Sequence, residues 1–397
     1  MNMKVKIAGV EFKNPVMTAS GTFGSGAEYS EFVDLNQLGA VVTKGVANVP
    51  WAGNATPRIA EVHSGMMNAI GLQNPGIDVF CERDIPFLQQ FDTKVIVNVC
   101  GHAPEEYLAV VERLAEEPID MMEINISCPN VNANFLAFGQ DPKHVEELTA
   151  QIKKVAKQPV IMKLTPNVTD IAEIARAAEA GGADAVSLIN TLTGMKIDIN
   201  RRTFALANKT GGVSGPCVKP VAVRMVYQAA QAVKIPIIGM GGIQNTEDAL
   251  EFIMAGATAV SIGTANFTNP YATIEVIDGI QKYMEKNQIE DIHETDRLCA
   301  NKKIIKTASR PRNDFHGSGG CFSVLLFFCP LYFQRFLFFC FKNISARADR
   351  IFHNTSSVGK YFYFFSAYRA CPVFWYRCSV LAFTTFHNCH SSYLLLF

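Results

Sequence analysis

The sequence predicts an α/β fold, a closed (β/α)8 barrel of parallel strands, the TIM barrel architecture. Eight short apolar runs alternate with amphipathic segments, and each run ends in glycine or a polar residue. Residues 180–191 (AGGADAVSLINT) and 255–265 (AGATAVSIGTA) repeat one unit of helix end, turn and strand. Eight such alternations favour a closed barrel, with an open doubly wound sheet as the alternative.

The expected strands are short, rich in Val, Ile and Met, and followed by polar residues or glycine. They are 15–20 (PVMTAS), 40–44 (AVVTK), 94–99 (KVIVNV), 121–127 (MMEINIS), 160–164 (VIMKL), 185–190 (AVSLIN), 236–242 (PIIGMGG) and 259–264 (AVSIGT). Amphipathic segments such as 141–157 and 246–257 are expected to be helices between them. The first begins with Asp141 as a cap and Pro142 at the first helical position.

The chain divides into two unlike parts, and we expect a barrel domain over residues 1–294 and a separate tail over 295–397. Beyond residue 294 lie 17 of the 28 phenylalanines and 7 of the 11 cysteines. Residues 301–397 contain 12 Lys and Arg against 2 Asp and Glu, whereas residues 1–300 contain 24 against 34. The tail shows neither helical nor strand periodicity, so we expect it not to belong to the fold.

Two features bear on location. The apolar run 321–341 is long enough for a membrane span but has Pro330, Gln334 and Arg335 near its centre, where a charge is costly, so a span is the less favoured alternative. The first residues form no apolar stretch of signal-peptide length. We therefore expect a cytoplasmic protein with reduced thiols at Cys81, Cys100, Cys128 and Cys217.

The strand ends predict one functional site, because parallel strands of a barrel all end at the same mouth. The polar residues and glycines there are Ser20, Gly21, Lys44, Asn98, Asn125, Cys128, Lys163, Asn190, Thr191, Gly241, Gly242, Gly263 and Thr264. Lysine and asparagine side chains are unfavourable in the packed interior of a barrel. Together at the strand ends they therefore indicate a site for an anionic, heteroaromatic ligand. The glycine loops after the last two strands are where barrels commonly bind phosphate.

Other ligand classes are not indicated. The glycine order of 21–26 (GTFGSG) is wrong for a dinucleotide fingerprint, so no nicotinamide site is expected. The cysteines of the barrel are too scattered for an iron–sulfur cluster, and no metal site is expected.

From about Lys4 to Ile292 the chain resembles the catalytic subunit of dihydroorotate dehydrogenase, of the cytosolic NAD-linked type. The resemblance rests on TASGTFGSG, VVTKGV, SGMMNAIGLQNPG, NISCPN, MKLTPN, LINTLTGMKID, ANKTGGVSGP and GMGGI, in this order along the chain. It implies a barrel that holds FMN at its mouth and oxidises dihydroorotate to orotate in pyrimidine biosynthesis.

Matched residue by residue, the resemblance implies two sets of contacts. The implied flavin contacts are Ser20, Lys44, Gly45, Asn98, Asn125, Lys163, Ile189, Gly215, Gly241, Gly242, Gly263 and Thr264. The implied substrate contacts are Lys44, Asn68, Ala69, Ile70, Gly71, Leu72, Asn125, Asn190 and Thr191. Lys163 is the implied cation for the reduced flavin, and Cys128 is the implied catalytic base.

A base is chemically required, because oxidising a ring C–C bond removes a hydride from one carbon and a proton from its neighbour. The unperturbed pKa of a thiol, about 8.5, makes it usable near neutral pH where its surroundings favour the thiolate. The resemblance further implies a homodimer of catalytic chains and a partner subunit with FAD and a [2Fe–2S] cluster that passes electrons to NAD⁺.

Two departures from the family pattern stand out. Residues 132–136 (NANFL) stand where the family usually has a lysine or similar residue and a Gly-Gly pair after NISCPNV, and the resemblance fades near residues 289–294. Three alternatives remain open: a flavin barrel acting on dihydropyrimidines without a carboxylate, a non-redox isomerase or lyase binding a sugar phosphate, and a product whose tail prevents the barrel from assembling.

Overall fold

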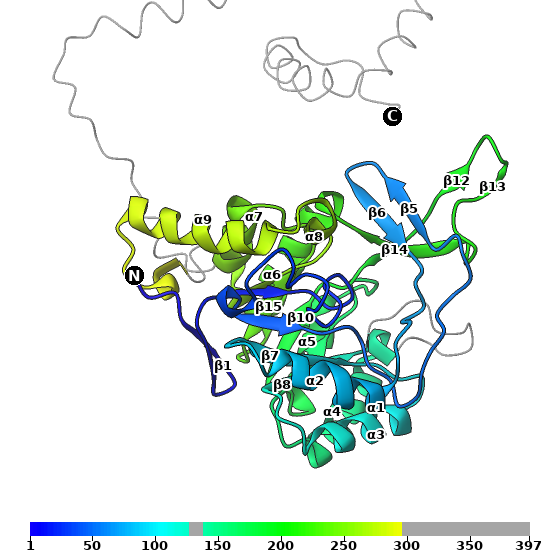
Figure 1. Cartoon of the computed structure of the whole chain (residues 1–397), viewed down its shortest axis with the longest axis horizontal. Coiled ribbons are helices and arrows are strands. Elements are labelled where there is room, and N and C mark those ends of the chain that lie inside the picture. The colour runs from blue at the N-terminus through cyan, green and yellow to red at the C-terminus, as the bar shows by residue number, and fades with distance from the viewer. Residues whose placement is uncertain (127–137, 296–397) are drawn as a thin grey trace, which may run out of the picture. The chain divides into compact units, whose positions relative to one another are not determined.

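The predicted barrel is confirmed in the computed structural model, which describes residues 1–126 and 138–295 (Figure 1). Eight parallel strands form a closed barrel in the order β10-β15-β16-β3-β4-β7-β8-β9, so the open doubly wound sheet is excluded. The strands are β3 (Val16–Thr18), β4 (Ala40–Val42), β7 (Lys94–Val99), β8 (Met121–Asn125), β9 (Val160–Lys163), β10 (Ala185–Leu188), β15 (Ile237–Met240) and β16 (Ala259–Ile262).

These strands read as nearly continuous apolar runs because both faces of a barrel strand are covered. Every residue of β4, β8, β9, β10, β15 and β16 is buried. In such a setting Val and Ile pack well on both sides of the pleat. Each strand lies within one of the eight ranges predicted from the sequence. Most stop before the polar residues or glycines that close the range, whereas β7 includes Asn98, β8 ends at Asn125 and β9 ends at Lys163.

Helices between the strands cover the barrel and supply most of the remaining core. The longer ones are α3 (Pro104–Leu114), α4 (Pro142–Val155), α5 (Ile171–Ala180), α6 (Lys219–Ala232), α7 (Thr246–Ala255) and α9 (Ala272–Asn287). The predicted start of α4 is confirmed, since the Asp141 carboxylate accepts from the Lys143 and His144 amides. Shorter helical turns are α1 (Ile77–Val79), a π turn (Phe80–Asp84), α2 (Ile85–Leu88), α8 (Ala265–Thr268) and 3-10 turns at Leu35–Gln37, Phe138–Gln140, Pro216–Val218 and Ile292–Thr295.

Three additions to the barrel were not predicted from the sequence. They are the hairpin β1 (Val5–Ile7) and β2 (Val10–Phe12), a four-stranded antiparallel sheet, and the small hairpin β12 (Ile197–Asp198) and β13 (Thr203–Phe204). The sheet has the order β11 (Leu192–Met195), β14 (Thr210–Ser214), β6 (Gly65–Asn68) and β5 (Ile59–Val62). Figure 1 shows β5, β6 and β14 side by side at one side of the barrel, with β12 and β13 projecting beyond them. We call this four-stranded sheet the lid sheet.

Some sequence predictions lie outside the described residues. Cys128, the departure at 132–136 and the whole tail from residue 296 belong to this group. In the described parts of the chain, every helix is too short or too polar to span a bilayer.

Candidate functional site

Twelve of the thirteen predicted strand-end residues line one cavity of about 950 Å³ at the mouth of the barrel, and the thirteenth, Cys128, lies outside the described residues. All twelve residues implied as flavin contacts line it: Ser20, Lys44, Gly45, Asn98, Asn125, Lys163, Ile189, Gly215, Gly241, Gly242, Gly263 and Thr264. Of the implied substrate contacts, Asn68, Ile70, Gly71, Leu72, Asn190 and Thr191 line the same cavity. Ala69 does not line it: this residue is buried beside Met67 and Leu206.

Two lysines give the described wall of the cavity a positive balance. Lys44 follows β4 and Lys163 ends β9, while Glu61 is the acidic residue of the described lining. The Lys163 side chain is almost fully buried, with Nζ 2.9 Å from Ser20 Oγ and 3.4 Å from Glu123 Oε2. Two ammonium groups in a partly desolvated cavity favour an anionic ligand.

Three asparagines contribute amide groups to the floor of the cavity. Asn190 Nδ2 donates to Asn125 Oδ1 at 3.3 Å, which ties the loop after β10 to the end of β8. Asn98 Nδ2 donates to Glu123 Oε2 at 2.6 Å. Asn98 Oδ1 is buried and accepts no hydrogen bond from the described residues. Because an unsatisfied buried acceptor is costly, this oxygen is suited to a ligand N–H.

The two glycine loops after β15 and β16 form another part of the lining. Gly241 and Gly242 have φ of 123° and 87°, values that glycine adopts readily. A Cβ on Gly242 would lie 2.8 Å from Gly215 O and 2.8 Å from Lys219 Cβ, so the loop has no room for a side chain there. Such close backbone approach is what a phosphate-binding loop needs.

A salt bridge between Lys219 and Asp248 joins the start of α6 to the start of α7, beside the glycine loop that follows β15. Lys219 Nζ lies 2.6 Å from Asp248 Oδ1, and Asp248 Oδ2 accepts the Gln244 amide at 2.9 Å. Lys219 begins α6, and Asp248 lies in the first turn of α7. The loops before these two helices therefore keep a fixed relation at the cavity.

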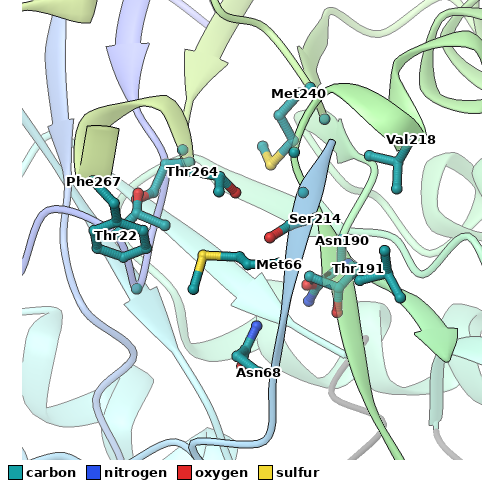
Figure 2. Close-up of a pocket in the computed structure, with 18 of the residues that line it drawn as sticks. Thr22, Met66, Asn68, Asn190, Thr191, Ser214, Val218, Met240, Thr264 and Phe267 are labelled. Atoms are coloured by element: carbon teal, nitrogen blue, oxygen red, sulfur yellow. Dashed lines mark hydrogen bonds between the residues drawn. The ribbon is translucent and has the colours of Figure 1, made fainter. Parts of the chain in front are cut away.

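The lid sheet supplies cavity residues that sequence reasoning missed. Ile59, Glu61 and Val62 from β5, Met66 from β6 and Ser214 from β14 all line the cavity. Figure 2 shows Met66 and Asn68 between a side formed by Thr22, Thr264 and Phe267 and a side formed by Asn190 and Thr191. The sequence SGMMNA shows no alternation of apolar and polar residues that would have marked β6, although in the structure Met66 and Asn68 line the cavity and Met67 between them is buried.

The thiols of the described chain do not line the cavity. None of Cys81, Cys100 and Cys217 belongs to its described lining. Burial raises the pKa of the Cys81 thiol to about 11, so it is a poor base at neutral pH. Histidine is likewise absent from the described lining. Cys128, the predicted base, lies outside the described residues.

Comparisons with known proteins give one consistent result. The model of the family described as dihydroorotate dehydrogenase matches residues 2–284. Over 294 residues the chain is 73% identical to the "Dihydroorotate dehydrogenase B (NAD(+)), catalytic subunit" of Lachnoclostridium phytofermentans, which covers 74% of this chain and 98% of that protein. It is 66% identical over 294 residues to the protein of the same name from Alkaliphilus metalliredigens, covering 74% and 97%.

A solved structure agrees at the level of the fold. The crystal structure of DHODH from Eimeria tenella in complex with ferulenol matches with a TM-score of 0.65 at 22% sequence identity. The match covers 76% of this chain and 89% of that chain, so the two share the barrel architecture.

Proposed function

The chain belongs to the dihydroorotate dehydrogenase family of oxidoreductases, and on this premise we propose that it oxidises dihydroorotate to orotate with FMN bound in the cavity. The observation that carries the proposal is the convergence of the implied flavin and substrate residues on one cavity at the barrel mouth. This reaction is a step of pyrimidine biosynthesis.

The residues present fit FMN. The buried, unsatisfied Asn98 Oδ1 suits the ring N–H of an isoalloxazine, and Lys163 suits its electron-accepting edge. Gly241, Gly242 and Gly263 have no side chains, so the backbone of these loops can come close to a phosphate. When bound, FMN would accept the hydride of the substrate, while side chains of this chain bind and orient the substrate and remove its proton.

The substrate is proposed to lie against the Lys44 and lid-sheet side of the cavity. Lys44 supplies a cation for the carboxylate, and Asn68, Asn125 and Asn190 supply donors and acceptors for the amide edges. The lid-sheet residues Met66 and Val62 offer apolar cover that limits access of water. The alternative substrate, a dihydropyrimidine without the carboxylate, would leave Lys44 unused.

Three further parts of the proposal concern the rest of the system. Cys128 is proposed to remove the proton from the substrate carbon. Electrons are proposed to pass to NAD⁺ through a partner subunit with FAD and a [2Fe–2S] cluster, with the catalytic chains paired as a dimer in the cytoplasm. The catalytic domain is proposed to end at residue 294, with the tail outside the fold.

The proposal is tested by the absorbance of the purified chain before and after anaerobic addition of dihydroorotate. We expect flavin bands that bleach with dihydroorotate and do not bleach with dihydrouracil, because only the former carries the carboxylate. Colourless protein that takes up no added FMN would refute the flavin assignment. Equal bleaching by both compounds would instead favour the alternative substrate.

Replacing Lys44 with alanine is expected to weaken orotate binding by about 1.5 to 3 kcal/mol, or roughly 10- to 150-fold, because the carboxylate loses its charged partner. The measurement is titration of the flavin spectrum with orotate. Lys282→Ala, an exposed lysine on α9, is the matched control and should bind orotate as the wild type does. Unchanged affinity in Lys44→Ala would remove this residue from the substrate site.

A further inference from the structure

A buried carboxylate lies just below the cavity floor, and neither the sequence analysis nor the proposed function assigns it a role. Glu123, in the middle of β8, has a side chain only 2% exposed. It does not line the cavity. Asn125, two residues further along β8 and on the same face of the strand, does line it. Glu123 therefore lies one layer beneath the mouth of the barrel.

Glu123 binds side chains from three neighbouring barrel strands. Its Oε2 accepts from Asn98 Nδ2 of β7 at 2.6 Å and lies 3.4 Å from Lys163 Nζ of β9. Its Oε1 accepts from Ser187 Oγ of β10 at 2.7 Å. The strands β7, β8, β9 and β10 are consecutive in the closed barrel, so one carboxylate links four of its eight strands. Two of its three partners, Asn98 and Lys163, line the cavity.

The hydrogen bond between Glu123 and Asn98 determines whether the amide nitrogen or the amide oxygen of Asn98 is available to a ligand. An ionised carboxylate only accepts hydrogen bonds, so Asn98 must turn Nδ2 toward Glu123. Its Oδ1 is then left as a buried acceptor with no partner among the described residues. A glutamine at position 123 could donate as well as accept and would allow the amide to turn over. The charge of Glu123 thus keeps Asn98 an acceptor.

The contact with Lys163 sets the local charge. Lys163 is 4% exposed, and an ammonium so deeply buried needs a compensating anion. Glu123 supplies that anion while Ser20 Oγ holds the same ammonium from the cavity side at 2.9 Å. The pair is close to neutral as a unit, so the positive charge felt in the cavity is smaller than that of an isolated lysine.

We propose that Glu123 is a positioning residue for the flavin: it fixes the Asn98 amide as an acceptor and the Lys163 ammonium in place, and it moderates the charge beneath the cofactor ring. This inference rests on the proposed function, because it assumes FMN in the cavity. It assigns Glu123 an effect on flavin affinity and on reduction potential through Asn98 and Lys163, without contact to the flavin.

The test compares Glu123→Gln with the wild type in FMN titrations and in dye-equilibration measurements of the midpoint potential of bound flavin. We expect oxidised FMN to bind at least about tenfold more weakly, because the Asn98 acceptor is no longer held. The potential should become more positive, because removing a negative charge favours the reduced, more negative flavin. A tenfold change in the ratio of oxidised to reduced affinity is about 30 mV for two electrons.

Two variants serve as controls. Ser187→Ala removes one hydrogen bond to Glu123 and keeps the charge, so the midpoint potential should equal that of the wild type. Glu123→Asp also keeps the charge but withdraws the carboxylate from Asn98, so it should weaken FMN binding while leaving the potential near the wild-type value. Thermal unfolding of each flavin-free variant shows whether the barrel itself is intact.

An unchanged midpoint potential in folded, flavin-loaded Glu123→Gln would overturn the inference, whatever the affinity, because a merely structural residue leaves the potential alone. If Glu123→Gln does not fold, Glu123→Asp decides, and unchanged FMN affinity in that variant would overturn the inference. A wild-type chain that binds no FMN refutes the proposed function and this inference together. If the wild type binds FMN and the Glu123 variants have the wild-type FMN affinity and midpoint potential, this inference alone is refuted.

Discussion

Replacing Cys128 with alanine is expected to slow reduction of the bound flavin by dihydroorotate at least about a hundredfold, because a positioned base typically contributes 10² to 10⁴ in rate. FMN and orotate should still bind, since the base is needed only when the proton leaves. The measurement is anaerobic stopped-flow spectroscopy of the purified chain mixed with dihydroorotate. A wild-type rate in the alanine variant would mean that the base lies elsewhere.

The controls for this prediction separate a thiol base from a general loss of structure. Cys217→Ala removes an exposed thiol outside the described cavity lining and should keep the wild-type rate. Cys128→Ser should be slow near neutral pH and should recover as the pH rises, because an unassisted hydroxyl is a far poorer base than a thiol. Cys81 cannot substitute, because burial raises its thiol pKa to about 11.

The second large effect concerns the electron acceptor: the chain alone is expected to reduce dyes or oxygen with dihydroorotate but to form no appreciable NADH. The sequence contains no dinucleotide fingerprint, and the cysteines of residues 1–294 have no cluster spacing. The related proteins bear the name of a catalytic subunit, which agrees with electrons leaving through another subunit. The measurement is NADH absorbance with and without an added FAD and [2Fe–2S] subunit.

NADH formation should begin when that partner is added. The assay uses both the full chain and a chain shortened to residue 295, because the basic, phenylalanine-rich tail could obstruct docking. Robust NADH formation by the chain alone would refute the partner proposal and reopen residues 21–26 as a nucleotide loop. Dye reduction serves as the control that the oxidation of dihydroorotate itself is intact.

The barrel could be predicted because its strands carry a local signal. Runs such as KVIVNV become strands by their own β-branched composition, and burial on both faces removes any need for alternation. The lid sheet carried no comparable signal. Strands β6 and β14 pair although some 140 residues separate them, and β14 itself, with the sequence TGGVS, contains two glycines and has weak strand propensity.

The residues of the candidate site likewise fall into those that the sequence predicts and those that only the structure reveals. Lys44, Asn98 and Lys163 were predictable because each follows or ends an apolar run, and parallel strands of a barrel end at one mouth. Met66 and Ser214 were missed, because the lid sheet that brings them to the cavity forms through long-range pairing. Ala69 was included with its neighbours by motif, yet it is buried against Met67 and Leu206 because side chains of an extended segment alternate between two faces.

By itself, the sequence determined the barrel, the positions of its strands and the family, because these depend on local composition and on motifs read in order. Only the tertiary structure decided which side chains meet. Glu123 is one charged residue inside an apolar run, and nothing local tells whether it faces the barrel interior or the surrounding helices. Closure of the barrel places it beside Asn98, Lys163 and Ser187, and in that water-poor layer a carboxylate is held only where donors from neighbouring strands surround it.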